Sequence, residues 1–190
     1  MANLTSMLVK QHADVYVLMT KNATNFIHPI TFETLTNHKT LVDTFDRNFN
    51  YNIEHVSLAK KADIVLVAPA SANVIGKIAN GIADDMVTTT VMACKCKKLI
   101  APAMNTQMFE NPIVQDNMKR LQNYGFEMVE AASGHLACGD SGIGKLPEEK
   151  LLVEHIVRSI AREKDMKGMK VLVSAGATME AIDPVRYITN

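Results

Sequence analysis

Short apolar runs that stop at proline alternate with stretches of helical spacing along most of the chain. Residues 63–68 are almost wholly apolar, and a second apolar run, residues 98–101, ends at Pro102. Runs of this length are typical of parallel strands that are buried on both faces. Proline then ends the ladder, because it has no N–H to donate. The alternation predicts an α/β fold with a Rossmann-like, doubly wound parallel sheet.

Helix start and stop signals lie between and after these runs. Asn111 before Pro112 is a good helix start, because asparagine caps a helix and proline is tolerated at its first position. Gly81 is a candidate left-handed cap for a helix over residues 74–80. We also expect helices at 29–36, from 53 to about 61, at 82–90, at 117–124 and at 147–164, and strands at 14–20 and 126–130.

Glycine spacing predicts one segment without regular structure. Four glycines occur between residues 134 and 145. Because glycine adds conformational freedom, this density predicts a mobile loop, as a flap over an active site requires.

The two ends of the chain do not fit a complete domain of this class. Residues 4–12 have helical spacing, whereas a nucleotide-binding α/β domain normally opens on a strand and a glycine-rich turn. We therefore expect the first strand to be missing. Residues 169–178 begin a new strand and small-residue turn after the helix at 147–164. The expected organisation is a truncated domain over 1–164, a linker over 165–168, and the stub of a second domain over 169–190.

Composition excludes several classes of function. The 190 residues are 47% hydrophobic, and 20 basic residues balance 20 acidic ones, so no net charge attracts nucleic acid or an anionic membrane. No apolar run approaches the roughly 20 residues that span a bilayer. Three cysteines without a framework spacing indicate a reducing, cytosolic setting. Cys94 and Cys96 lack a second ligand pair, so no metal site is expected.

Polar residues follow the predicted strands, at the edge where ligands bind to parallel sheets. Thr20 ends the strand at 14–20, Ser71 and Asn73 follow Pro69, and Asn105 follows Pro102. Each of these positions also suits a helix cap or a ligand-free loop, and the pattern alone leaves both interpretations open. Asn105 could offer its amide to a carboxylate, and the nearby apolar side chains could either wall a flat ligand or simply cover the sheet end: Met104, Met108 and Phe109.

Three further positions have chemically useful side chains. His55 begins a predicted helix, where histidine more often caps or packs than reacts. Cys138 lies between Ala137 and Gly139 in the glycine-rich segment, either as an accessible thiol or as an incidental cysteine. Asp84 and Asp85 suit a helix N-terminus through the helix dipole, so we do not interpret them as a catalytic pair.

Four motifs occur in the order that is found in the flavin-dependent cysteine decarboxylases. They are His-x-x-Leu-Ala from His55, Pro-Ala-Ser-Ala-Asn at 69–73, Pro-Ala-Met-Asn-Thr-Gln-Met at 102–108, and Ala-Cys-Gly at 137–139. From residue 1 to about 164 the chain resembles this family. The Ala-Cys-Gly motif is similar to the phosphopantothenoylcysteine decarboxylase branch rather than to the lantibiotic peptide decarboxylases. Residues 174–190 resemble the opening of phosphopantothenate–cysteine ligase, which many bacteria fuse behind the decarboxylase.

The resemblance implies an FMN-dependent enzyme of coenzyme A biosynthesis that converts 4′-phosphopantothenoylcysteine to 4′-phosphopantetheine. His55 would assist proton transfer beside the flavin, Cys138 would donate a proton from a flap, and Asn105 would hold the substrate carboxylate. The implied cofactor contacts are Thr20, Phe26, Ser71, Asn73, Thr88 and Met104. The implied substrate contacts are Asn73, Asn105, Met108, Ala137 and Lys145.

The resemblance also implies a cytoplasmic homotrimer or assembly of trimers, with the small-molecule substrate as its partner. The alternatives are a peptide-cysteine decarboxylase of the same family and a flavin-binding or regulatory relative without turnover. In the family a glycine/serine-rich turn holds the flavin phosphate, and that turn is absent from this sequence. We therefore expect FMN binding by this chain to be weak or absent.

Overall fold

A parallel sheet lies at the centre of the molecule. The computed structural model describes residues 1–44, 54–135, 139, 141–161, 168–170, 172, 179–183 and 185–189. In these residues β1 (Ile64–Ala70), β2 (Lys97–Pro102) and β3 (Glu127–Met128) pair in parallel in the order β1–β2–β3. The helices are α1 (Ala2–Lys10), the 3-10 helix η1 (Lys21–Asn25), α2 (Ile30–Thr36), α3 (Glu54–Lys61), α4 (Ala72–Ala79), α5 (Met86–Ala93), α6 (Thr106–Glu110), α7 (Pro112–Asn123) and α8 (Glu149–Ile160).

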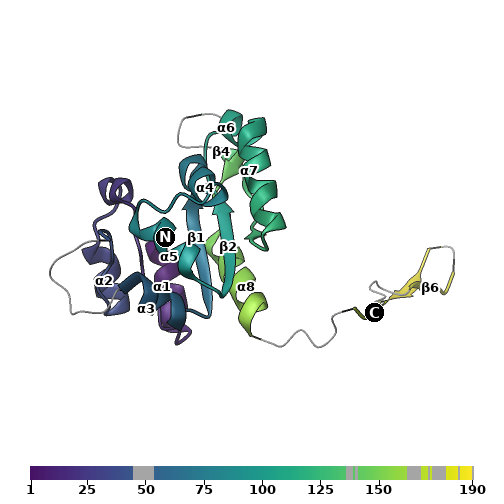
Figure 1. The fold of residues 1–190 in the computed structure, drawn as a ribbon. Coiled ribbons are helices and arrows are strands. Elements are labelled where there is room, and N and C mark those ends of the chain that lie inside the picture. Colours follow the sequence, from purple (N-terminus) through teal and green to yellow (C-terminus); the bar gives the residue numbers. More distant parts are fainter. Residues whose placement is uncertain are drawn as a thin grey trace.

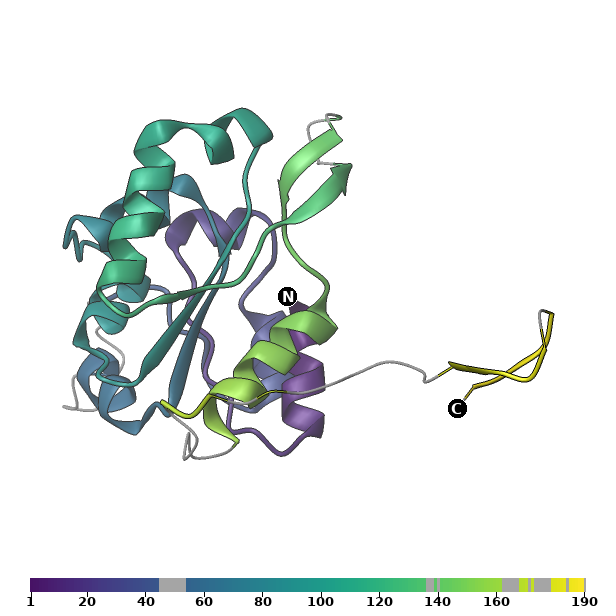
Figure 2. The same ribbon diagram turned by 90° about the vertical axis from the view of Figure 1, so that its right-hand side faces the viewer.

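Both faces of the sheet are apolar. Successive side chains along a strand point to opposite faces, and both sets are apolar in β1 and β2. Val67 and Ile100 point to one face, where they pack with residues of α4, α5 and α7. Leu99 and Ala101 point to the other face, where they pack with residues of α1 and α8. Figure 2 shows α7 and α8 on opposite sides of the strands. The predicted doubly wound α/β fold is therefore confirmed.

Local cap signals place the helix ends largely as predicted. Asn111 accepts the Ile113 N–H at 2.9 Å, and Pro112 is the first residue of α7. Gly81 follows α4 with a φ of 72°, as expected for a left-handed cap. One short helix was not expected, because α6 lies in the stretch that we interpreted as a loop after β2.

Two other predictions about elements are wrong. Residues 14–20 do not form a regular strand, since their pairing is a single parallel bridge between Leu18 and Leu41. The glycine-rich segment is not a loop throughout, because β4 (Ala132–His135) and β5 (Ser141–Lys145) form an antiparallel hairpin. Glycine weakens a ladder through entropy but keeps both of its backbone hydrogen-bonding groups, so the ladder can still form.

The C-terminal region contains a second hairpin. β6 (Met179–Ala181) pairs antiparallel with β7 (Tyr187–Thr189), and Figure 1 shows this hairpin apart from the sheet and its helices. The predicted linker at 165–168 and strand at 169–178 lie mostly outside the described residues. Within the described part of the chain, no helix is both long and apolar enough to span a bilayer.

Glu127 links the edge of the sheet to α8. Its carboxylate lies 2.8 Å from Lys97 Nζ, 2.7 Å from Arg158 Nη2 and 3.2 Å from His155 Nδ1. Burial alone would raise the pKa of Glu127, but the hydrogen bonds from Lys97, Arg158 and His155 outweigh it and lower the pKa to about 2. The ionised carboxylate therefore stabilises the folded state.

Core packing on β2 gives a first test of the fold. Leu99 is fully buried, whereas Ile113 on α7 is 71% exposed. We expect Leu99→Ala to lower the free energy of unfolding by about 2–5 kcal/mol, because it leaves a cavity in the core. Ile113→Ala should change that free energy by less than about 0.5 kcal/mol. Urea denaturation measures both, and equal small effects would contradict the assigned core.

The Glu127 contacts give a second test, which uses the pH dependence of the free energy of unfolding. The folded pKa lies below the ordinary value of 4.5, so the stabilisation is present above about pH 4.5 and is lost as the pH falls toward 2. Glu127→Gln should lower the free energy of unfolding by about 1 kcal/mol at pH 7, with a shrinking difference from wild type at acid pH. Exposed Glu130→Gln is the control. A pH-independent difference would contradict the assigned pKa.

Candidate functional site

The loops after β1 and β2 leave the sheet side by side. Ala70 at the end of β1 pairs with Pro102 at the end of β2, and the Ala103 N–H donates to the Ala70 carbonyl at 2.9 Å. This is the carboxyl edge of a parallel sheet, where ligands bind in folds of this class. The contact places the Ser71–Asn73 segment beside the loop that carries Met104 and Asn105.

The β4–β5 hairpin joins the same edge. The Met104 N–H donates to the Gly144 carbonyl of β5 at 2.9 Å. Lys145, the next residue, is exposed. Figure 1 shows α4, α6 and the hairpin gathered at one end of the sheet. Ser71, Asn73, Met104, Asn105 and Lys145, predicted from separate parts of the sequence, thus belong to three segments that meet there.

Thr20, Ser71 and Asn105 cap the helices that follow them. Thr20 Oγ1 accepts the Ala23 N–H at 3.2 Å, and Ser71 Oγ accepts the Val74 N–H at 3.4 Å. Asn105 Oδ1 accepts the Gln107 N–H at 2.9 Å. The carbonyl oxygen of Asn105 makes the cap, and the Nδ2 amide is the hydrogen-bond donor of this side chain. The helix-cap interpretation is therefore confirmed, and ligand binding by these groups stays a prediction.

Apolar side chains border the same loop. Met104 and Phe109 are half-buried against the core residues of α4 and α7, while Met108 is 49% exposed. Phe26, at the end of η1, is 92% exposed. Whether these side chains contact a flavin or a substrate stays a prediction.

Several polar groups near α5 have structural partners. Thr88 is fully buried and forms a reciprocal capping box with Asp85, so its role toward a cofactor stays a prediction. Lys77 Nζ lies 2.7 Å from Asp84 and 3.1 Å from Asp85. Burial would raise the pKa of Asp85, but hydrogen bonds from Thr88 and Lys77 lower it. Burial raises the pKa of the Cys94 thiol to about 11, which leaves little reactive thiolate at neutral pH.

The structure does not bring all predicted residues into contact. His55 lies in the first turn of α3 and is half-buried. Among the described residues, no hydrogen bond joins His55 or Thr20 to the Asn105 loop. Ala137 and Cys138 lie outside the described residues, and their roles stay predictions. In the part of the chain that the structure covers, no group of three or more His, Cys, Asp or Glu side chains could hold a metal ion.

Sequence reasoning missed Thr106 and Gly142. Thr106 Oγ1 is buried and has no hydrogen-bond partner among the described residues, and it faces Gly142 of β5 across a close contact. One signal was present in the sequence, because two glycines within three residues, Gly142 and Gly144, are typical of a close approach by another backbone.

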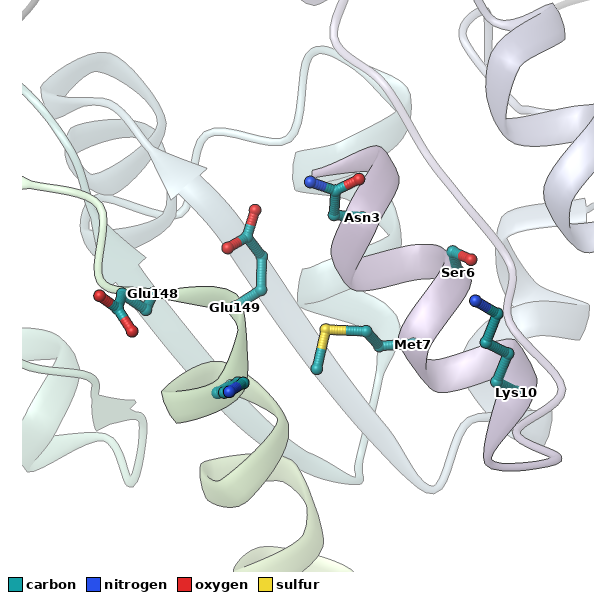
Figure 3. Close-up of a pocket in the computed structure, with 7 residues that line it drawn as sticks. Asn3, Ser6, Met7, Lys10, Glu148 and Glu149 are labelled. Carbon is teal, nitrogen blue, oxygen red and sulfur yellow. The ribbon is translucent and has the colours of Figure 1, made fainter.

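Two cavities lie away from this edge. Figure 3 shows an open cavity of about 500 Å³ between α1 and α8, with Asn3, Ser6, Met7 and Lys10 on one side and Glu148 and Glu149 on the other. A second cavity, of about 540 Å³, is bordered by Asn80, Met92, Arg120, Tyr124 and Phe126 among others. Neither contains a predicted site residue. We place the candidate site at the strand ends, because backbone hydrogen bonds join its segments there.

Comparisons with family models match both parts of the chain. A model described as "Flavoprotein" matches residues 1–161. A second model, described as "DNA/pantothenate metabolism flavoprotein C-terminal domain", matches residues 166–190.

Curated relatives are similar over nearly the whole chain. The coenzyme A biosynthesis bifunctional protein CoaBC of Bacillus subtilis (strain 168) is 46% identical over 189 residues, which are 98% of this chain and 47% of that protein. The protein of the same name in Borreliella burgdorferi is 40% identical over 187 residues, covering 98% of this chain and 48% of that protein. The chain spans about half the length of the curated relatives it matches.

Solved structures have a similar fold. A mutant PPC decarboxylase complexed with pantothenoylaminoethenethiol has a TM-score of 0.72 and 26% identity, covering 82% of this chain and 87% of that one. The FMN-dependent cysteine decarboxylase SpaF has a TM-score of 0.72 and 29% identity, covering 85% of this chain and 89% of that one.

The capping role of Ser71 gives a test of the site's local geometry. Ser71→Ala removes the acceptor for the Val74 N–H, and we expect it to lower the free energy of unfolding by about 0.5–1 kcal/mol. Ser133→Ala, at an exposed position of β4, is the control and should have a smaller effect. Thermal or urea unfolding measures the difference. A Ser71→Ala protein as stable as wild type would contradict the assigned cap.

Proposed function

The chain belongs to the Flavoprotein family, and on that basis we propose that, at saturating FMN, it decarboxylates 4′-phosphopantothenoylcysteine to 4′-phosphopantetheine in coenzyme A biosynthesis. The weak FMN binding that we expect from the sequence stays a prediction. The observation that carries the proposal is the joined carboxyl edge, where the start of α4 with Ser71 and Asn73 lies beside the loop with Asn105, linked by the Ala103–Ala70 hydrogen bond. The printed names of the CoaBC relatives and of the PPC decarboxylase structure support the substrate class.

The residues at this edge fit a flavin. A flavin is flat and largely apolar, with polar groups along its edge, so it requires an apolar wall and hydrogen-bonding groups beside it. Met104, Met108 and Phe109 provide apolar surface, and Ser71 and Asn73 are exposed polar residues in the first turn of α4. The N–H groups at the start of that helix favour electron-rich oxygen atoms. When bound, FMN supplies the oxidation and re-reduction of the cysteine moiety.

The chain's own residues would orient the substrate and move protons. The Nδ2 amide of Asn105 would donate a hydrogen bond to the substrate carboxylate and fix the carboxylate that leaves as carbon dioxide. His55, half-buried at the start of α3, would take up a proton near the flavin. Cys138 would donate a proton to carbon after carbon dioxide has left, and Lys145 would contact the substrate.

A peptide-cysteine decarboxylase is the second candidate. It is favoured by the fold, since the peptidyl-cysteine decarboxylase EpiD has a TM-score of 0.68, close to the 0.72 of the PPC decarboxylase. The higher identity of the CoaBC relatives and the match of residues 166–190 to a pantothenate-metabolism domain favour the first proposal. A cytoplasmic location and a homotrimer or assembly of trimers are part of the proposal, on the family resemblance alone.

Exchanging one atom of the Asn105 side chain tests the proposal. Asn105→Asp keeps the oxygen that caps α6 but replaces the amide donor with a negative charge that repels a carboxylate. In saturating FMN we expect kcat/KM for carbon dioxide release from 4′-phosphopantothenoylcysteine to fall about 100-fold or more. The absorbance spectrum of bound FMN should stay close to wild type.

Asn111→Asp is a matched control. Asn111 caps α7 through the same kind of bond, in which Oδ1 accepts the Ile113 N–H at 2.9 Å, and it is exposed. This variant should keep activity within about twofold of wild type, because it makes the same chemical change outside the proposed site. Full activity in Asn105→Asp would refute the role proposed for Asn105.

A further inference from the structure

Two glycines of β5 face the loop that carries Asn105. A Cβ on Gly142 would meet Thr106 and a Cβ on Gly144 would meet Met104, so both glycines face this loop, although the β4–β5 register shifts at Gly144. At Gly144 the contact is a backbone hydrogen bond, with the Met104 N–H donating to its carbonyl at 2.9 Å. At Gly142 the neighbour is the side chain of Thr106, the residue directly after Asn105. The hairpin thus contacts the residues before and after Asn105, which are Met104 and Thr106.

Neither position has room for a side chain. A Cβ added to Gly144 would lie 2.3 Å from the Met104 carbonyl oxygen. A Cβ added to Gly142 would lie 2.4 Å from Thr106 Oγ1 and 3.0 Å from Thr106 Cγ2. Contacts this short are not tolerated, so either substitution must move the hairpin or the loop.

The reason for glycine differs between the two positions. Gly144 has a φ of 126°, which disfavours other residues regardless of contacts. Gly142 has no such backbone conformation. The close approach of Thr106 therefore accounts for glycine at position 142, which makes Gly142 the sharper test of docking.

Thr106 connects Gly142 to the start of α6, so a displacement at Gly142 would move the first residue of that helix. Its Oγ1 is buried without a hydrogen-bond partner among the described residues, so packing against Gly142 is the contact that the structure gives it. Threonine is branched at Cβ, so its side chain cannot easily rotate away from a new neighbour. Displacing Thr106, the first residue of α6, would also displace Asn105, which caps that helix.

We propose that Gly142 and Gly144 are positioning residues: they let the β4–β5 hairpin dock on residues 104–106 and so hold the Asn105 amide in place. The role of that amide toward substrate rests on the proposed function, whereas the docking does not. The hairpin and the Asn105 loop then behave as one unit, and a change at the glycines acts on substrate through Asn105.

A rescue experiment tests the contact in the full chain. Gly142→Ala should lower kcat/KM at least about 10-fold and speed hydrogen exchange of the Met104 amide. Adding Thr106→Ala removes Oγ1 and Cγ2, the two nearest atoms, and leaves the Thr106 Cβ at 3.2 Å. The double variant should regain Met104 protection and a kcat/KM within about threefold of Thr106→Ala alone. Gly144→Ala should not be rescued by Thr106→Ala, because the obstructing atom is a backbone oxygen.

Gly134→Ala is the control for strain within the hairpin. Gly134 lies in the partner strand β4 with a φ of 154°, and its nearest neighbour is the flexible Lys145 side chain at 3.6 Å. Gly134→Ala should leave the hydrogen exchange rate of the Met104 amide unchanged. The proposal is overturned if Gly142→Ala retains activity and Met104 protection, if Gly134→Ala exposes Met104 equally, or if Thr106→Ala brings no rescue.

Two further outcomes complete the test. A Gly142→Ala chain that fails to fold while the double variant folds supports the contact, and failure of both to fold overturns it. If exchange and rescue follow the expected pattern but wild type releases no carbon dioxide from 4′-phosphopantothenoylcysteine, the docking is supported and the proposed function is what fails.

Discussion

The candidate site depends on the close approach of three backbone segments at one edge of the sheet. The Ala103 N–H donates to Ala70 and the Met104 N–H donates to Gly144, each at 2.9 Å, so one loop is held on both sides by main-chain hydrogen bonds. Bonds of this kind fix the path of a loop through its backbone. The sheet supports the arrangement, because β1 and β2 are packed on both faces.

Helix capping and ligand binding are compatible uses of the same residues. Ser71 and Asn105 each cap the helix that follows a strand, which fixes the direction in which the helix leaves the sheet. A capped helix at a strand end presents its first-turn N–H groups to the crevice. The structural and the functional interpretations of these residues, which compete in the sequence, therefore describe one geometry. In this proposal Asn105 Oδ1 accepts the hydrogen bond that caps α6, and its Nδ2 amide donates to the substrate carboxylate.

The sequence predicts those elements that are determined by local residue patterns. The apolar runs of β1 and β2 and the cap at Asn111 are readable because burial and capping leave residue patterns. The hairpin was missed because its docking depends on contacts between Gly142, Gly144 and a loop far away in the chain. The segment at 14–20 has strand-like residues but a single bridge to Leu41, since strand formation requires a partner that composition does not specify. The motif resemblance identified the family, but the contacts of Thr106 could come only from the structure.

The central claim is that this edge of the sheet holds a flavin and the carboxylate of a phosphopantothenoyl substrate. The most direct measurement supplies the chain with saturating FMN and compares carbon dioxide release from 4′-phosphopantothenoylcysteine and from a peptide that ends in cysteine. The account predicts carbon dioxide from 4′-phosphopantothenoylcysteine and little or none from the peptide. Release from the peptide alone, or from neither compound, would contradict it.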